Sequence, residues 1–251
     1  MGEFVTPEWL SRTGLLLGSE MLEYFSGKEV AIIGLGGVGA YAAEMIARAG
    51  VGKLVILDCD VVAPSNKNRQ LLALDSNMGK SKAVLMEQRI KEINPNAWVT
   101  TIEAFLNEET VSQLLGSFDL DYIVDAIDTL SPKIALIQFA LSRGIPLVSS
   151  MGAGAKRDAA KIRVKDLSKS FNCPLAYMLR KRLRKLGISK GFKVVFSEEL
   201  PDTSAIIEVE EQNKKSQVGT ISYMPAVFGC IAAQTALDHL ICSFHEDHNS
   251  I

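Results

Sequence analysis

A glycine-rich stretch near the start of the chain has the residue types and spacing of a phosphate-binding turn. It reads GLGGVG and lies between a short β-branched run and a segment of small and apolar residues at helical spacing. Glycines at such a turn let backbone N–H groups approach a phosphate at the N-terminus of the following helix. The candidate phosphate-binding residues are Gly34, Gly36, Gly37 and Gly39.

An acidic residue, Asp58, ends the next apolar run, where a carboxylate commonly binds the ribose hydroxyls of a nucleotide. The glycine turn and this acid together predict that the chain binds an adenine nucleotide. They do not distinguish ATP from NAD.

Polar and cationic residues follow Asp58 in the chain. Arg69 and Lys82 are the cations, and Asn66, Asn68 and Gln70 surround the arginine in the sequence NKNRQ. Two cations beside a glycine turn neutralise a triphosphate and a leaving pyrophosphate, whereas hydride transfer has no such need. ATP is therefore the predicted cofactor, and NAD is the alternative.

A second acidic segment, DAIDT, ends the fourth apolar run, at the edge of a parallel sheet where ligands bind. A carboxylate there suits a magnesium ion that bridges the phosphates of ATP. Taken alone, Asp125 could instead cap a helix, and Lys82 could be an ordinary solvated lysine. The order of all these residues favours an ATP and Mg²⁺ site.

The segments that position these residues alternate between short apolar runs and helical patterns. Strands are predicted at 29–35, 53–57, 98–102, 122–126 and 145–149. Helices are predicted between them, at 41–49, 79–93, 108–115 and 133–142. This alternation predicts an α/β fold, a Rossmann-like, doubly wound and mostly parallel sheet with helices on both faces.

The character of the chain changes after residue 150, and we expect a C-terminal elaboration from residue 156. Further strands are predicted at 161–164 and 193–197, a basic helix at 174–187 and a closing helix at 225–240. The acidic, polar segment 198–217 is predicted to be a long, mobile crossover. We expect three parts, namely an N-terminal helical arm (1–26), an ATP-binding core (27–155) and the elaboration (156–251).

The composition is that of an ordinary globular protein, since 47% of the residues are apolar and 22% are charged. The four cysteines are scattered and form no C-x-x-C pair, so neither a disulfide framework nor a zinc site is expected, and a reducing cytoplasm fits best. The apolar segment 225–241 contains Gln234, Asp238 and His239, which predicts a buried helix and no transmembrane segment.

These motifs, in this order, resemble the E1-like adenylating superfamily, which includes the ThiF, MoeB and HesA group and the ubiquitin-activating enzymes. The resemblance rests on GLGGVG, D-x-D-x5-N-x-NRQ, G-K-x-K at 79–82, I-N-P at 93–95 and DAIDT. It implies that Gly37 approaches the phosphates and that Asp58 holds the ribose. Arg69 and Lys82 would contact the triphosphate, and Asp128 would hold magnesium.

The family resemblance also implies a homodimer. In this family an N-terminal arginine reaches into the ATP site of the partner subunit, and Arg12 in SRTGLLLG occupies that place in the sequence. Arg12 is therefore included among the expected catalytic residues.

The identity of the activated carboxylate separates the branches of the superfamily. Members that activate ubiquitin-like protein tails often carry two zinc-binding C-x-x-C pairs, which this sequence lacks. Its second half, through IPLVSSMGAGAKRD, CPLAYMLRKRLRKLGI and GTISYMPAVFG, instead resembles the tRNA threonylcarbamoyladenosine dehydratase branch. That branch implies adenylation of the threonine carboxylate of the modified adenosine next to the anticodon, followed by ring closure with loss of AMP.

Two alternatives stay open. One is an adenylyltransferase that activates the C-terminus of a ubiquitin-like sulfur carrier, and the more distant one is an NAD-binding protein. Protein partners for sulfur or electron transfer also stay open.

The charges of the chain are distributed unevenly. Residues 156–193 contain 13 basic and two acidic residues, whereas the rest of the chain contains 14 basic and 27 acidic ones. In the basic helix, Leu175, Leu179, Leu183 and Leu186 are predicted to share one stripe, opposite the cations. Such a cationic face suits an RNA backbone, and no DNA partner is expected. The alternative is an ordinary solvated surface helix. The candidate tRNA-binding residues are Lys156, Arg157, Arg180, Lys181, Arg184 and Lys185.

Two cysteines and two histidines are further candidates for site residues. Cys173 precedes the basic helix, where a thiol beside cations could be reactive, but capping or packing is the predicted role. Cys230 is predicted to pack in the core. His245 and His248 are expected in a polar, disordered tail without a role.

Overall fold

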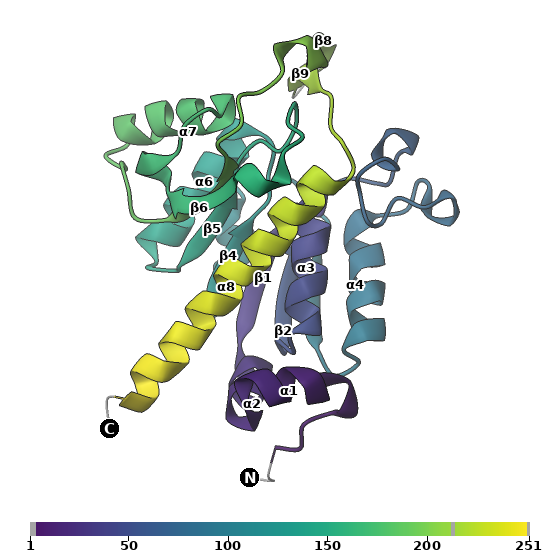
Figure 1. Cartoon of the computed structure of the whole chain (residues 1–251), viewed down its shortest axis with the longest axis vertical. Coiled ribbons are helices and arrows are strands. Elements are labelled where there is room, and N and C mark those ends of the chain that lie inside the picture. The colour runs from purple at the N-terminus through teal and green to yellow at the C-terminus, as the bar shows by residue number, and fades with distance from the viewer. Residues whose placement is uncertain (1–3, 212–213, 250–251) are drawn as a thin grey trace.

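In the computed structural model, which describes residues 4–211 and 214–249, helices cover both faces of one seven-stranded sheet (Figure 1). The strand order is β3-β2-β1-β4-β5-β7-β6, and only the edge pair β6 and β7 is antiparallel. The strands are β1 (Glu29–Ile33), β2 (Lys53–Leu57), β3 (Trp98–Ile102), β4 (Tyr122–Asp125), β5 (Leu147–Ser150), β6 (Ile162–Asp166) and β7 (Lys193–Ser197).

The strand order reverses between β1 and β4. From β1 the chain adds β2 and β3 on one side and then returns to add β4 and β5 on the other. At such a reversal the loops that leave the carboxyl ends of the two strands diverge and leave room for a ligand. The predicted fold class is confirmed, while the three-part division of the chain stays a prediction.

The helices are divided between the two faces of the sheet. Alternate side chains of β1 point to opposite faces, so Val30 and Ile32 pack in one core with α3 and α8, and Ala31 and Ile33 pack in the other with α6 and α7. The helices are α1 (Ser11–Leu17), α2 (Ser19–Gly27), α3 (Gly39–Arg48), α4 (Lys82–Ile93), α5 (Val111–Leu115), α6 (Leu130–Ser142), α7 (Pro174–Lys185) and α8 (Tyr223–Asn249). Short 3-10 turns are η1 (Glu8–Leu10), η2 (Pro64–Asn66), η3 (Asp75–Asn77), η4 (Ala159–Lys161), η5 (Leu167–Lys169) and η6 (Thr203–Ala205).

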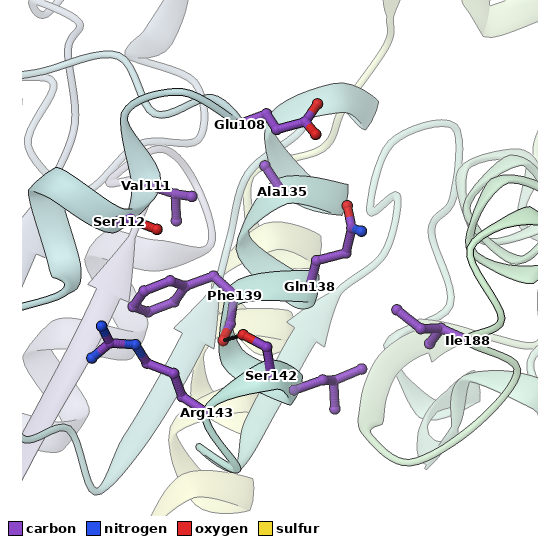
Figure 2. A pocket seen from close by; sticks show the side chains of 10 residues that line it. Glu108, Val111, Ser112, Ala135, Gln138, Phe139, Ser142, Arg143 and Ile188 are labelled. Atoms are coloured by element: carbon purple, nitrogen blue, oxygen red, sulfur yellow. Dashed lines mark hydrogen bonds between the residues drawn. The ribbon is translucent and has the colours of Figure 1, made fainter.

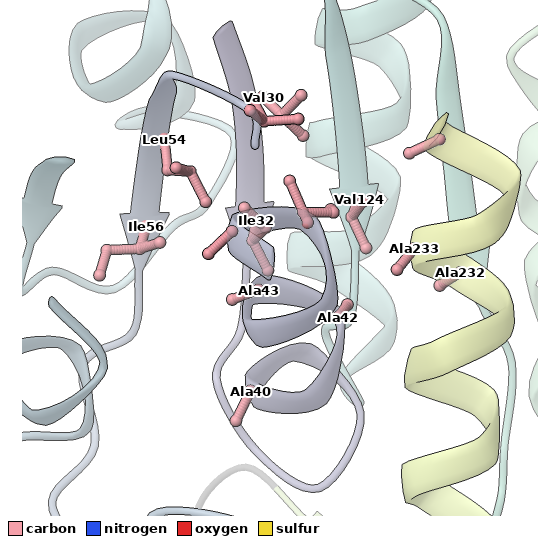
Figure 3. Close-up of a cluster of buried hydrophobic side chains, with 14 of the residues drawn as sticks. Val30, Ile32, Ala40, Ala42, Ala43, Leu54, Ile56, Val124, Ala232 and Ala233 are labelled. Carbon is pink, nitrogen blue, oxygen red and sulfur yellow. The ribbon is translucent and has the colours of Figure 1, made fainter. Parts of the chain in front are cut away.

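Small side chains let α3 and α8 approach the sheet and each other closely. Figure 3 shows Ala42 and Ala43 of α3 beside Ala232 and Ala233 of α8, next to the valine and isoleucine side chains of the strands. At Gly229 an added Cβ would lie 2.3 Å from the Val38 carbonyl oxygen, so a larger residue would push α8 away from α3.

Helix α8 is 27 residues long and extends beyond the predicted end at residue 240. It contains His245 and His248, whose rings lie beside Phe244, so the expected polar tail is helical. Of the helices in the described residues, α8 alone is long and apolar enough to cross a membrane, but a core helix passes the same test. Its buried side chains, among them Phe228 and Leu240, pack in the core on one face of the sheet.

Three local predictions were wrong. The segment 198–217 contains most of an antiparallel hairpin, β8 (Ile206–Glu211) with β9 (Lys214–Val218), and its strands were missed because the sequence of the segment is mostly polar. Cys230 lies on the exposed side of α8. Leu186 is 48% exposed, since α7 ends one residue earlier, at Lys185.

Candidate functional site

The glycine turn lies where the strand order reverses, directly against the loop that follows β4. The Gly34 N–H donates to the Leu57 carbonyl oxygen (2.8 Å), which joins the turn to the end of β2. Gly34 has φ +90°, and a Cβ there would lie 2.9 Å from the carbonyl oxygen of Ala126. At Gly39 a Cβ would lie 1.7 Å from the Gly34 carbonyl oxygen. Any side chain at either position would separate the turn from the β4 loop.

The outer part of the turn is covered by two other segments. A Cβ at Gly37 would lie 2.9 Å from Pro225 Cβ in the first turn of α8 and 3.3 Å from the Arg69 carbonyl oxygen. Helix α3 begins at Gly39, and its N-cap residue, Val38, provides no side-chain cap. A bound anion can take that capping role, because the first N–H groups of a helix have no partner within the helix.

Asp58 is buried at the end of β2 and is held by backbone N–H groups. Its Oδ2 accepts from the Leu35 N–H (2.6 Å) and its Oδ1 from the Asp60 N–H (2.8 Å). Burial raises the pKa of Asp58, against the opposing effects of Lys82 and of these two N–H groups. The carboxylate is thereby fixed beside the glycine turn.

The loop after β2 brings the NKNRQ residues to the glycine turn. Arg69 Nη1 donates to the Ser65 carbonyl oxygen and to Asn68 Oδ1, both at 2.9 Å. Asn68 Nδ2 donates to the Thr220 carbonyl oxygen (2.9 Å), which ties this loop to the segment before α8. Asn66 Oδ1 accepts from the Ala63 N–H (3.1 Å), so the amide of Asn66 shapes the loop itself.

Gln70 supplies a direct sign that the site is built for a ligand. Its Oε1 is buried and, within the part of the chain that the structure describes, has no hydrogen-bond partner. Its Nε2 lies 3.6 Å from the position of a Cβ on Gly36, next to the glycine turn. A buried acceptor without a donor is costly, and a hydroxyl or amino group of a bound molecule would remove that cost.

Lys82 is the first residue of α4 and is only 4% exposed. It was predicted one turn inside the helix, but Ser81 caps the helix and places the start later than expected. Its Nζ lies 2.9 Å from Asp60 Oδ2, and that aspartate side chain is 64% exposed. Lys82 is therefore a buried cation whose ammonium group is paired with a partly exposed carboxylate.

The loop after β4 is anchored by a fully buried ion pair that sequence reasoning missed. Lys133 Nζ lies 2.7 Å from Asp125 Oδ2 and donates to Ser149 Oγ and the Ser150 carbonyl oxygen, both at 3.0 Å. Asp125 Oδ2 also accepts from Ser149 Oγ (2.6 Å), and Oδ1 accepts from the Ile127 N–H (3.1 Å). A lysine within the apolar helix sequence LSPKIALIQFALS was the signal for this pair.

The two carboxylates of DAIDT therefore have different environments. Asp125 neither caps a helix nor faces the site, because Lys133 neutralises it and Thr129 is the N-cap residue of α6. Asp128 is exposed on the loop that touches the glycine turn. Of these two acids, Asp128 is the exposed one, on the loop beside the glycine turn.

A second group of possible metal ligands lies at the end of β2. One ligand atom from each of Asp58, Cys59 and Asp60 lies within 4.8 Å of the others. Asp60 is already paired with the ammonium group of Lys82, and the carboxylate oxygens of Asp58 accept backbone N–H groups. These partners compete with a metal ion at this cluster.

Arg12 is the predicted site residue that lies far from the glycine turn. It is exposed on α1, which lies at the opposite end of the sheet (Figure 1). That end is marked by Leu10, whose Cδ1 lies 2.9 Å from the Cβ position of Gly50, at the start of β2. Within one chain, Arg12 does not reach the nucleotide site.

The predicted tRNA-binding residues differ in their exposure. Lys156 is only 3% exposed, and its Nζ donates to the Gly152 carbonyl oxygen (3.2 Å), so its prediction as part of an exposed patch was wrong. Burial lowers the pKa of Lys156. Arg180 is half-buried, and its Nη1 donates to the Ser170 carbonyl oxygen (2.8 Å). The exposed cations are Arg157, Lys181, Arg184 and Lys185.

Cys173 is the N-cap residue of α7 and is 4% exposed, which agrees with the packing role predicted for it. Its Sγ lies 3.7 Å from the Cβ position of Gly152. The contact places the first turn of α7 against the loop that leaves the carboxyl end of β5.

A separate pocket lies away from the glycine turn and the loops around it. It has a volume of about 520 Å³ and opens between α5, α6 and Ile188, with Glu108, Phe139 and Arg143 in its wall (Figure 2). None of the glycine-turn residues lines it. This pocket is therefore not the nucleotide site. The glycine turn and the buried acceptor of Gln70 indicate that site instead.

A family model described as the ThiF family matches residues 10–250 of the chain. The chain belongs to the ThiF family. Two relatives of this ThiF-family protein are tRNA threonylcarbamoyladenosine dehydratases. The Bacillus subtilis protein is 46% identical over 191 residues, 76% of this chain and 75% of its own. The Escherichia coli protein is 35% identical over 262 residues, 96% of this chain and 97% of its own.

Solved structures of the Escherichia coli dehydratase have the same fold as this ThiF-family protein. The complex with ATP has a TM-score of 0.86 and 35% identity and covers 97% of this chain and 99% of that one. The complex with AMP has a TM-score of 0.87 and covers 98% of this chain. The alternative of an NAD-binding protein is therefore disfavoured.

Proposed function

We propose that this ThiF-family protein is an ATP-dependent tRNA threonylcarbamoyladenosine dehydratase. The threonine carboxylate of the modified adenosine attacks the α-phosphate of ATP, and pyrophosphate leaves. The carbamoyl group then attacks the acyl carbon, a proton is lost and AMP is expelled, so that the net change is loss of water. The observation that carries the proposal is the convergence of the glycine turn, Asp58 and Lys82 in a chain that matches an ATP-binding dehydratase over its length.

The residues of the site have distinct roles in this proposal. The glycine turn and the N-terminus of α3 bind phosphate oxygens, and Asp58 accepts hydrogen bonds from the ribose. Arg69 and Lys82 neutralise the charge that develops as pyrophosphate leaves. Gln70 Oε1 accepts from the bound nucleotide, which satisfies its buried lone pairs.

We assign a magnesium ion to the exposed carboxylate of Asp128. Carboxylate oxygens are ligands that Mg²⁺ prefers, and the ion usually keeps several waters and substrate phosphates in its shell. The Asp125–Lys133 pair holds the loop that carries Asp128 against the glycine turn. When bound, the ion supplies charge neutralisation of the phosphates.

We also propose that the active form is a homodimer in the cytoplasm. Leu15 and Leu16 on α1 are 89% and 81% exposed, which is unusual for two adjacent large apolar side chains. Arg12 lies on the same short helix. A second copy that covers these leucines would bring Arg12 to the neighbouring subunit, where its guanidinium can contact the phosphates.

The exposed cations Arg157, Lys181, Arg184 and Lys185 would contact the tRNA. A protein tail gives no reason for such a density of positive charge, whereas a phosphate backbone does, through release of counterions. For this reason tRNA is preferred to a sulfur-carrier protein as the substrate. Any sulfur- or electron-transfer partner would be accessory to this reaction.

Pyrophosphate release tests the proposal. The purified protein with ATP and Mg²⁺ should release pyrophosphate when tRNA carrying threonylcarbamoyladenosine is added, and mass spectrometry of the hydrolysed tRNA should show loss of 18 Da, the mass of one water. Asp128→Ala should abolish both signals. Release that responds only to a carrier protein ending in Gly-Gly would overturn the proposal in favour of the adenylyltransferase alternative.

A further inference from the structure

A small pocket on the surface of α7 is lined by one aromatic and three cationic residues. They are Tyr177, Arg180, Lys181 and Arg184, and the pocket has a volume of about 370 Å³. Their spacing of i, i+3, i+4 and i+7 places them on one face of the helix. The opposite face of α7 is buried in the core through Ala176, Leu179 and Leu183.

Tyr177 is the unusual member of this group. It is 58% exposed, and in the described part of the chain its ring makes no contact with another ring. Cations alone would attract any phosphate. An exposed aromatic ring among cations adds a flat apolar surface on which a nucleobase can stack.

Arg180 gives the pocket a fixed wall. Its guanidinium donates to the carbonyl oxygen and to the hydroxyl of Ser170, so its plane is held. Lys181 and Arg184 are exposed. The four residues therefore combine an aromatic ring and a hydrogen-bonded guanidinium with two exposed cations.

The first turn of α7 lies against the loop that leaves the carboxyl end of β5. The N-cap residue, Cys173, contacts Gly152 in that loop. Tyr177 lies four residues farther along, a rise of about 6 Å in an α-helix. The pocket therefore begins about one helical turn from this contact, on the solvent face of α7.

We propose that this pocket holds an unpaired base of the tRNA loop, stacked on Tyr177, with Lys181 and Arg184 on the neighbouring phosphates. The inference rests on the proposed tRNA substrate and deepens it, because it adds recognition of a single-stranded segment to general attraction by charge. A base inside a duplex has both faces covered by its neighbours. Aromatic stacking therefore selects loops, whereas phosphate contacts do not.

Binding of two RNAs to the full-length protein tests this assignment. Fluorescence anisotropy would compare an anticodon stem-loop with a blunt duplex of the same length over a series of salt concentrations. Tyr177→Ala should weaken stem-loop binding by about 5- to 150-fold, the range for loss of stacking on one base. It should leave duplex binding and the salt dependence unchanged.

Two variants serve as controls. Tyr177→Phe keeps the ring and should bind the stem-loop as the wild type does, while Lys181→Ala should weaken both RNAs and lower the salt slope by about 0.7 to 0.9. Equal effects of Tyr177→Ala on both RNAs, or none on either, would overturn stacking while leaving the proposed substrate intact. If the wild type binds neither RNA, both this inference and the proposal that tRNA is the substrate are overturned.

Discussion

Lys133→Met should destabilise the protein more than any exposed substitution of the same kind. The lysine and Asp125 side chains are both 0% exposed, and their charged atoms are 2.7 Å apart. Removal of one partner of a buried pair leaves a buried charge and typically costs about 3–5 kcal/mol. Asp125 would keep the Ser149 hydroxyl and the Ile127 N–H, so we expect the lower end, about 3 kcal/mol.

Urea unfolding measures this difference. The midpoint of Lys133→Met should fall with an unchanged slope, because the surface exposed on unfolding stays the same. The double variant Asp125→Asn, Lys133→Met should recover part of the loss, since no uncompensated charge remains. A double-mutant cycle of the wild type, the two single variants and the double variant should give a coupling free energy of roughly 2–3 kcal/mol.

The chain offers a matched control for burial. Lys67 and Asp75 are also 2.7 Å apart, but their side chains are 45% and 86% exposed. Lys67→Met should cost less than about 1 kcal/mol because water already solvates both groups. Equal losses for Lys67→Met and Lys133→Met would refute the argument that burial makes the inner pair strong.

Three further outcomes are expected. Gly37→Ala should raise the ATP dissociation constant in calorimetry, because its Cβ would lie 2.9 Å from the first turn of α8; unchanged affinity would contradict the close approach of the turn. Burial raises the pKa of Glu44, but hydrogen bonds from Arg89 and Arg48 outweigh it and hold the pKa below the ordinary 4.5. The stability that Glu44 contributes is therefore present above pH 4.5 and is lost as the pH falls through its lower folded pKa. The difference in urea midpoint between the wild type and Glu44→Gln should shrink below pH 4.5. Leu15→Glu should give a folded monomer in sedimentation, since this side chain is 89% exposed in one chain, and a persistent dimer would exclude the α1 interface.

Much of the fold follows from local patterns. The strands β1, β2 and β3 were predicted to within two residues, because each is a short apolar run that ends in a glycine or a polar loop. Helix starts were less accurate, as Lys82 illustrates. Its backbone N–H donates to the Asp60 carbonyl oxygen (3.1 Å), a contact with a loop that no helical pattern contains.

The supporting contacts of the site depend on the tertiary structure. Lys133 was hidden because its three partners belong to two different strands, β4 and β5, that meet only in the sheet. The unpartnered acceptor of Gln70 was equally invisible, since it arises from the way the loop lies over the glycine turn. The motifs predicted the ligand, but the residues that hold the motif residues in place were visible only in the folded structure.

The sequence by itself determined the alternation of strands and helices in the core, the glycine turn and the total charge of residues 156–193, because these depend on neighbouring residues and on composition. Only the tertiary structure decided which cations meet solvent. Lys156 and Lys181 look alike in sequence, yet one is 3% exposed and bonded to the Gly152 carbonyl oxygen, while the other lies on the open face of α7. The reason is physical, since a lysine's environment is set by the segments that fold over it, and these are distant in the chain.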